Sequence, residues 1–405
     1  MSTVFKGKAY LYKIYNSAGT FVTTWNDVLS EPEFSWEING GYSEMTVDLG
    51  RSVFSFGEGE DVDYGNQLKL YCFDRDTGDD GVLIYSGYIS RYEPVLSGSR
   101  EIVRVTLLGY WTETNQFMLE NGSGDTELAY LSVSPKDIIQ GILDYSTAAG
   151  GKVDYDGTSL DDPATTVSYT FNTNTIQEAL KKCLELSPDG WYFYINASDI
   201  LHYKNKAATA DHTFHLERHF VNYRQEKRTE NIVNKVYFSG GGSPKLYKVY
   251  EAAGSISSYG MHVKKVVDER VTVEATADIY ADRILDGQSS PEIRIMIDII
   301  DNNGEQTDLG YNIESIKPGD TCKILGATTK GYNLWDTMQW DVDAWDYDIT
   351  NSAATVLQIV RVQYFPHYAR LEISNRQPDI TKRIEDINRN LTNAQTADNP
   401  TTPTT

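Results

Sequence analysis

The segment from Thr229 to Asp320 carries the sequence features that most restrict the fold of this chain. Apolar and polar residues alternate over Ile232–Phe238 and again over Ile293–Ile299, which predicts two strands that each bury one face. Between them, Ala275–Leu285 has apolar residues at helical spacing and is followed by a glycine, which predicts a short helix. The Pro-Gly-Asp sequence at 318–320 predicts a turn into a further strand.

Residues 1–118 contain a series of short alternating segments. Lys8–Ile14 and Phe21–Trp25 predict one hairpin. Phe34–Ile38 and Met45–Leu49 predict a second, joined by a Gly-Gly pair that permits a tight turn. Further strands are predicted at Gln67–Phe73, Val82–Tyr92 and Glu101–Leu108. Because no long helix separates these strands, the sequence predicts a barrel or a sandwich.

Residues 125–212 have a different character. Ser134 followed by Pro135 is a typical helix start, with a capping side chain and a proline at the first position. Thr173–Leu186 predicts a second helix with one apolar face, and Trp191–Tyr203 predicts a hairpin after it. The sequence therefore predicts a small α+β domain between two β domains.

The two β regions share a weak internal repeat. Gly65 opens a strand in the first region as Gly319 does in the second. Each region also has a Tyr-x-Pro sequence at a strand end, at Tyr92–Pro94 and at Tyr364–Pro366, where proline is expected to stop pairing on one edge. Two interpretations stay open, a true duplication and a chance similarity between hairpins.

Composition excludes several classes of protein. The chain of 405 residues has 28 Tyr and 31 Gly, as expected for β-rich domains, and its length suits about two to four of them. No apolar run reaches the roughly 18 residues that a spanning helix needs, so we expect no membrane insertion. We also expect no cleaved export signal, and the three widely spaced cysteines indicate a reducing cytoplasm.

The formal charge of −22 argues against general affinity for nucleic acid, because phosphate binding needs clustered Lys and Arg. The acidity has two open interpretations. It confers solubility alone, or it lines a channel whose wall repels passing DNA.

Two motifs raise the question of a metal site. Asp74–Gly81 is rich in carboxylates but lacks the Gly and Glu that an EF-hand loop requires, so a hairpin turn is the better interpretation. His212, His215 and His219 would share one face of a helix and bind zinc there. Their surroundings alternate as in a strand, however, where the first two point to opposite faces. We therefore predict no metal ion and no cofactor.

Known catalytic motifs are missing from the sequence. There is no Gly-x-Ser-x-Gly elbow, no His-Glu-x-x-His helix and no phosphate loop. We therefore predict that the chain is not an enzyme. A carboxylate pair for glycoside hydrolysis is recognisable only in three dimensions, so a cell-wall hydrolysing protein stays an alternative.

The order of features around residues 229–320 resembles the hub proteins of phage tail tips. The features are the strand, the Ser255-x-x-x-Tyr259-Gly260 segment, the short helix, the next strand and the Pro-Gly-Asp turn. This family includes the baseplate hubs of contractile tails and the hub part of type VI secretion spikes. The resemblance implies two similar β-barrel domains flanking a small α+β domain, plus a C-terminal helix. The expected domains are a first barrel at 1–118, the α+β domain at 125–212, a second barrel at 213–376 with helix 275–286 and Trp-rich loop 331–350, and the helix and polar tail at 377–405.

The resemblance also implies a function and partners. The chain would be a structural hub in the virion tail tip, assembled in the bacterial host cytoplasm. A homotrimer would form a ring that joins a sixfold tail tube to a threefold tip and lets DNA pass. The implied partners are the distal tail protein ring, the C-terminus of the tape-measure protein, and a central fibre or other tip protein. The alternative is a β-rich carbohydrate-binding or cell-wall hydrolysing tail protein that uses the Trp-rich loop.

Two segments are candidate interfaces. The loop 331–350 repeats Trp-Asp three times, and three interpretations stay open: a subunit contact, an ordinary hairpin, and a sugar-binding platform. Residues 379–394 carry aliphatic residues at the spacing of a coiled-coil seam, which contacts another chain or packs on its own. The candidate interface residues are Trp335, Trp340, Trp345, Tyr347, Ile380, Ile384, Ile387 and Leu391.

Overall fold

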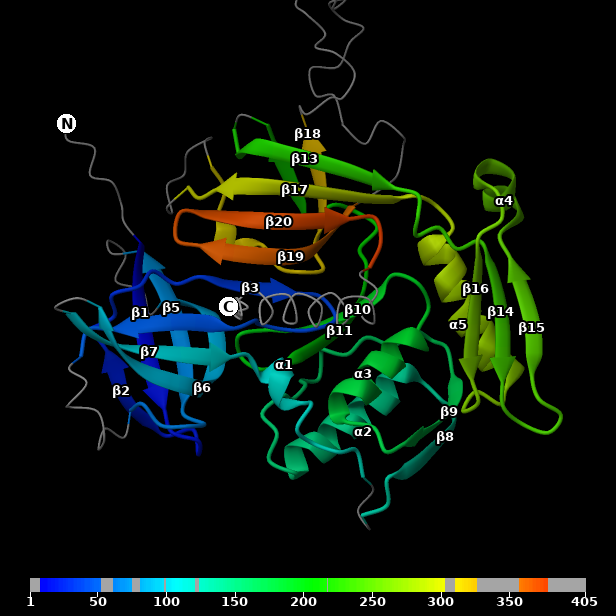
Figure 1. Cartoon of the computed structure of the whole chain (residues 1–405), viewed down its shortest axis with the longest axis horizontal. Coiled ribbons are helices and arrows are strands. Elements are labelled where there is room, and N and C mark those ends of the chain that lie inside the picture. The colour runs from blue at the N-terminus through cyan, green and yellow to red at the C-terminus, as the bar shows by residue number, and fades with distance from the viewer. Residues whose placement is uncertain are drawn as a thin grey trace, which may run out of the picture.

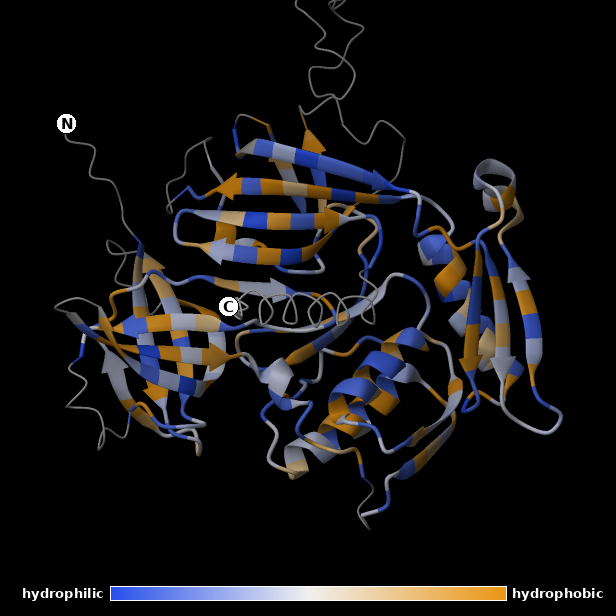
Figure 2. Cartoon of the chain, viewed as in Figure 1, coloured by the Kyte–Doolittle hydropathy of each residue, from blue (hydrophilic) through white to orange (hydrophobic). Residues whose placement is uncertain are grey.

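Two curled β-sheets, a helical region and a small three-stranded sheet make up the computed structural model of this chain (Figure 1). It describes residues 8–51, 61–74, 81–97, 100–120, 124–216, 218–302, 310–325 and 357–377. Orange and blue residues alternate along the strands of both large sheets (Figure 2), so each strand has one apolar face. The predicted mainly β fold with few helices is confirmed.

The first large sheet has six antiparallel strands in the order β2-β1-β5-β6-β7-β4. Their bounds are β1 Lys8–Tyr15, β2 Phe21–Trp25, β4 Met45–Leu49, β5 Gln67–Asp74, β6 Val82–Ser97 and β7 Arg100–Leu108. The two ends of the sheet meet where Val28, just after β2, bridges Leu49 of β4. The backbone N–H of Leu29 donates to Asp48 across this seam at 2.8 Å. The sheet therefore curls into a barrel around its own apolar face.

The second large sheet has seven strands, in the order β12-β18-β19-β20-β17-β13 with β3 beside β19. Their bounds are β3 Phe34–Glu37, β12 His212–His215, β13 Phe220–Arg228, β17 Glu292–Ile300, β18 Thr321–Leu325, β19 Leu357–Phe365 and β20 Tyr368–Ser374, with a 3₁₀ turn at Ile313–Ser315. Strand β3 comes from the N-terminal region and pairs with β19 from Arg361 opposite Glu37 to Tyr364 opposite Phe34. The two large sheets are thus joined through backbone pairing.

The helical region follows from strong local signals. Its elements are α1 Tyr110–Glu113, β8 Glu127–Val133, α2 Pro135–Ala148, β9 Val167–Asn172, α3 Ile176–Glu185, β10 Trp191–Ile195 and β11 Leu201–Asn205. Ser134 caps α2 by accepting from the backbone N–H of Asp137. Thr175 and Glu178 form a reciprocal capping box at the start of α3. The apolar faces of the two helices share one buried cluster.

The small sheet consists of β15, β14 and β16, with β14 parallel to β16. Its elements are β14 Lys235–Gly240, β15 Tyr247–Glu251, α4 Ala253–Tyr259, β16 Val263–Asp268 and α5 Glu274–Gln288. Val236 and Phe238 are buried in the same cluster as α2 and α3, whereas Tyr237 is exposed on the opposite face. The sequence analysis assigned these residues to the second barrel domain, 213–376, yet they pack on the helices of the α+β region. The domain limits stay a prediction.

The two large sheets repeat each other strand by strand. The ladder β4-β7-β6-β5 has the same register as β17-β20-β19-β18. Met45 of β4 faces Leu107 of β7, as Ile295 of β17 faces Ile373 of β20. The two ladders also share a bulge at the same place, between Ile89 and Arg91 in β6 and between Ile359 and Arg361 in β19. A matched bulge is a specific backbone feature, so the similarity is a duplication of structure.

The turns before β5 and β18 are also matched. The N–H of Gly65 donates to Ile89 at 3.1 Å, and the N–H of Gly319 donates to Ile359 at 2.7 Å. Both glycines have a positive φ angle, which type II turns require at this position. The repeat that the sequence indicated at these glycines therefore exists in the structure.

One ion pair occurs at the same position in both repeats as well. In the first repeat, Nε of Arg104 donates to Oδ1 of Asp48 at 2.8 Å. In the second, Nε of Arg370 donates to Oδ1 of Asp298 at the same distance. Each pair joins two neighbouring strands of its ladder, β4 and β7 in the first and β17 and β20 in the second.

The Tyr-x-Pro correspondence predicted from the sequence is wrong by two residues. The matched bulges make Arg91 equivalent to Arg361, so Tyr92 corresponds to Val362. Proline also does not end the strand in the first repeat, because Pro94 faces Val103 inside the ladder with β7. Pairing with β5 ends before this point, and proline is tolerated on a strand edge.

The two equivalent glycines give a testable difference. A Cβ at residue 65 meets nothing within 4 Å, whereas a Cβ at residue 319 collides with the ring of Tyr192. Gly65→Ala is therefore expected to cost about 1 kcal/mol from backbone strain alone. Gly319→Ala adds the collision and is expected to cost about 3 kcal/mol. Urea unfolding of the two variants measures the difference, and equal costs would contradict this account.

Candidate assembly site at the junction of the two repeats

Aromatic side chains from both repeats meet where β3 pairs with β19. The ring of Phe34 stacks on Tyr364 with centroids 5.0 Å apart, and its other neighbours include Tyr42 and Tyr85 at 5.7 and 5.1 Å. All four residues are buried. Stacked and edge-on aromatic pairs of this kind add specificity to apolar burial. They fix the angle at which the second repeat sits on the first.

A buried ionic cluster joins the same two sheets. The ammonium group of Lys8 in β1 lies 2.6 Å from Asp301 and 2.5 Å from Glu314. Glu314 also accepts from the hydroxyl of Tyr364 at 3.0 Å. The side chain of Asp301 is fully buried, and those of Lys8 and Glu314 are about a tenth exposed. One cation thus compensates two buried carboxylates that come from the other repeat.

Cys72 of β5 lies beside this cluster. Its sulfur is 3.6 Å from Glu314, and burial together with that carboxylate raises the pKa of the thiol to about 12. The thiol therefore stays protonated at neutral pH and acts as a small apolar residue.

A cleft of about 580 Å³ opens beside the junction. Its lining has four acidic side chains and two cations, Arg104 and Arg361. Arg361 donates to the hydroxyl of Ser35 at 2.9 Å, and Arg104 is held by Asp48. The lining residues are Ser30, Glu31, Glu33, Phe34, Ser35, Ser43, Glu44, Thr46, Asp48, Arg104, Arg361 and Gln363. The cleft would favour a cationic partner over DNA.

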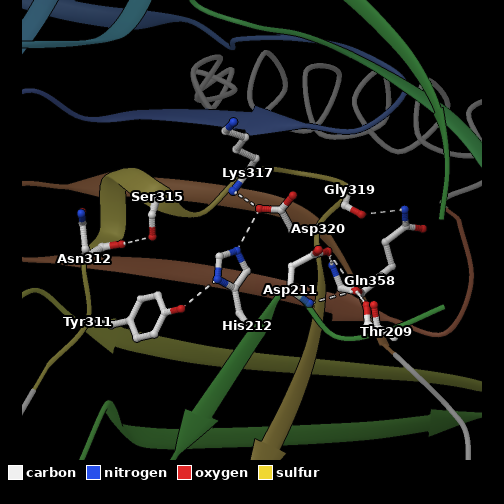
Figure 3. A network of polar contacts seen from close by, with 11 residues as sticks. Thr209, Asp211, His212, Tyr311, Asn312, Ser315, Lys317, Gly319, Asp320 and Gln358 are labelled. Atoms are coloured by element: carbon white, nitrogen blue, oxygen red, sulfur yellow. Dashed lines mark hydrogen bonds and ion pairs between the residues drawn. The ribbon is translucent and has the colours of Figure 1, made fainter. Parts of the chain in front are cut away.

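A polar network holds the turn before β18 (Figure 3). Asp320 accepts from the backbone N–H of Lys317 and pairs with Nε2 of His212, both at 2.9 Å. The other ring nitrogen of His212 lies 2.9 Å from the hydroxyl of Tyr311. On the far side of the turn, Asp211 accepts from the N–H of Thr321 at 2.8 Å. These contacts attach β12 to β18 in parallel.

The histidines predicted as a metal alternative do not converge. His212 and His215 point to opposite faces of β12, because side chains alternate along a strand. His215 instead has its backbone N–H directed at the ring of His219. Burial, with His215 and Arg218 close by, lowers the pKa of His219. Among the described residues no group of three or more His, Cys, Asp or Glu is placed to hold a metal ion.

A second junction, between the first barrel and the hairpin β10–β11, contains a half-buried carboxyl. Ser86 of β6 donates to Asp199 in the hairpin turn at 3.3 Å. Burial raises the pKa of Asp199 to about 7, with a further increase from Glu113 and an opposing effect from Ser86, Lys69 and Lys152. The charge of this carboxyl therefore changes near neutral pH.

The eight interface residues predicted from the sequence lie outside the described residues, in 326–356 and 378–405. Most of the predicted calcium-like turn, at 75–80, also lies outside them. Their roles stay predictions. Within the described part of the chain, no helix is long and apolar enough to cross a membrane.

Sequence reasoning missed the residues of the junction. Lys8 and Glu314 are 306 positions apart, and nothing in the sequence links them. The matched Arg91 and Arg361 did carry a signal, because each follows an isoleucine by two positions. Alignment on that Ile-x-Arg pattern finds the bulges that the Tyr-x-Pro pattern missed.

No family model and no curated protein matches this chain. Solved structures do match it. The prophage tail protein gp18 from Listeria monocytogenes EGD-e has a TM-score of 0.57 and 13% identity, over 94% of this chain and 99% of that one. This chain has the fold of phage tail proteins.

Two further tail proteins support this assignment. The 43 kDa tail protein of prophage MuSo2 from Shewanella oneidensis has a TM-score of 0.57 and 12% identity, over 91% of this chain and 98% of that one. The tail protein from Neisseria meningitidis MC58 has a TM-score of 0.56 and 12% identity, over 90% and 96%. The tail-protein fold spans almost the whole of these chains, and the resemblance expected from residues 229–320 is confirmed at the level of the fold.

Proposed function

We propose that this chain is a structural subunit of a phage tail tip or baseplate, resident in the virion and without catalytic activity. The observation that carries the proposal is its similarity to three tail proteins over 96% or more of their length. A match of this extent leaves little of those chains without a counterpart here. The polar networks described above support the same role, because their groups bond each other across strands and domains.

We further propose that three copies form a ring, which joins a sixfold tail tube to a threefold tip. The matched ladders support this proposal, since three chains with two similar sheets each present six similar units. Closed rings of identical subunits are common among homo-oligomers. The distal tail protein ring, the tape-measure C-terminus and a central fibre or other tip protein are the proposed neighbours. DNA passes through the ring without specific binding, consistent with the charge of −22.

The Trp-rich loop is the proposed contact to another subunit, and the aliphatic seam at Ile380–Leu391 is a second. Replacing Trp340 and Trp345 together by Ala should then reduce the yield of finished tails, because buried aromatic anchors commonly contribute about 2 kcal/mol or more each. Electron microscopy of particles from the variant phage measures this. Normal tails with lost adsorption would contradict the subunit contact and would support sugar binding instead.

A further inference from the structure

Strands β6 and β13 each keep an edge without a partner strand in the described part of the chain. β6 pairs with β5 only as far as Tyr88 and continues to Ser97 with β7 alone. β13 pairs with β17 on one side, and its other side makes a single bridge near Phe220. β13 is the last strand of the second large sheet, whereas the free part of β6 lies beyond the end of β5 (Figure 1). A free strand edge is a template for pairing with another chain.

The equivalent edge inside the chain shows what fills such a position. The part of β19 that follows its bulge corresponds to the part of β6 that follows its own bulge. In the second repeat, β3 pairs with this part of β19. The strand equivalent to β3 is the end of β13. Tyr42 precedes Met45 by three residues, and Glu292 precedes the equivalent Ile295 by three residues. Trp36 bridges Tyr42, and Arg228 pairs with Glu292. Arg228 is therefore equivalent to Trp36.

We infer that β13 of one copy pairs with β6 of the next, by the same contact that joins β3 to β19 within a chain. The inference rests on the proposed ring, and it names the strands and their register. Gln363 faces Ser35 within the chain, so Glu93 of one copy faces Lys227 of the next. The ladder ends at Pro94, as the internal one ends at Tyr364.

Side-chain chemistry agrees with this register. Glu93 and Lys227 carry opposite charges, and opposite charges directly across two strands stabilise the pair. Lys227 is exposed and Glu93 is half-buried in the single chain, so both are accessible to a partner. Repetition of one head-to-tail contact closes a ring when the rotation per unit divides the circle. In such a ring, the β3–β19 contact within each chain alternates with the β13–β6 contact between chains.

Cysteine cross-linking tests the register. The chain carrying Glu93→Cys and Lys227→Cys should form covalently linked dimers and trimers under mild oxidation, because facing residues have the Cα separation that a disulfide needs. Glu93→Cys with Arg228→Cys is the mismatched control, since a shift by one residue turns the side chain to the other face. Ser35→Cys with Gln363→Cys is the internal control, which closes within one chain. The three native cysteines are buried, so the unmodified chain gives the background.

Charge reversal gives a second reading. Glu93→Lys and Lys227→Glu alone should each weaken association by about two- to fivefold per contact, and the double reversal should restore it. If the unmodified chain is trimeric and the internal control closes, yet the 93–227 pair stays monomeric, the inference is wrong and the proposed ring stands. Equal linking by the 93–228 pair overturns the register. A monomeric chain overturns both the inference and the ring.

Discussion

Replacing Lys8 by Met is expected to lower the free energy of unfolding by about 3–5 kcal/mol, the usual cost of removing one partner from a buried ion pair. The variant keeps the aliphatic length of the side chain but removes the ammonium group. The change therefore removes the charge that lies 2.6 Å from Asp301 and 2.5 Å from Glu314 in the buried junction. The junction must take up a proton or open to water, and either response weakens the contact between the repeats.

A surface lysine provides the matched control. Lys245 pairs with Glu269 at 2.9 Å, and more than half of each side chain is exposed. Lys245→Met is therefore expected to change stability by about 0.5 kcal/mol or less. Urea unfolding of both variants at one protein concentration compares them. If Lys8→Met costs no more than Lys245→Met, the ionic cluster does not hold the two repeats together.

Replacing Asp199 by Asn is expected to stabilise the chain at pH 8 and to leave it unchanged near pH 4. Burial raises the pKa of this carboxyl in the folded chain to about 7, above its ordinary value of 3.8. A carboxyl whose pKa is raised on folding contributes stability that is fully present below its pKa in the unfolded chain. This stability is lost as pH rises through its pKa in the folded chain. The wild-type chain should therefore lose about 1–3 kcal/mol between pH 4 and pH 8 at this position, allowing for its partial exposure.

Asp156 gives a control of opposite sign. This carboxylate is exposed and accepts from the backbone and the hydroxyl of Thr158, which lowers its pKa. Any effect of Asp156→Asn should thus appear as pH falls, not as it rises. Thermal unfolding across the pH range separates the two variants. A constant difference between wild type and Asp199→Asn at every pH would show that the carboxyl does not titrate in this window.

Local signals in the sequence located most elements near the junctions. The cap at Ser134 and the helix at Thr173–Leu186 predicted α2 and α3, and the helix predicted at 275–286 is α5, Glu274–Gln288. These elements depend on capping and on apolar spacing, which neighbouring residues determine. The hairpin β1–β2 was predicted for the same reason. The second predicted hairpin is wrong, because its strands lie in different sheets, β3 beside β19 and β4 beside β7.

Long-range pairing could not be predicted in this way. Phe34–Ile38 was correctly predicted as a strand, but its partner β19 lies more than 300 residues away in the sequence. Nothing local in β3 indicates that it leaves its own sheet. The same limit applies to the ionic cluster, where Lys8, the first residue of β1, pairs with carboxylates from the second repeat. Comparison of the strand registers in the two repeats shows which strand pairs with each sheet edge.

The central claim is that the duplicated sheets are built to form a ring of three chains. Native mass measurement of the purified chain, followed by electron microscopy of the same sample, tests it most directly. We predict three times the mass of one chain, and a ring in which six similar units alternate between first and second repeats. A mass of one chain at every concentration, with single copies in finished tails, would contradict the account.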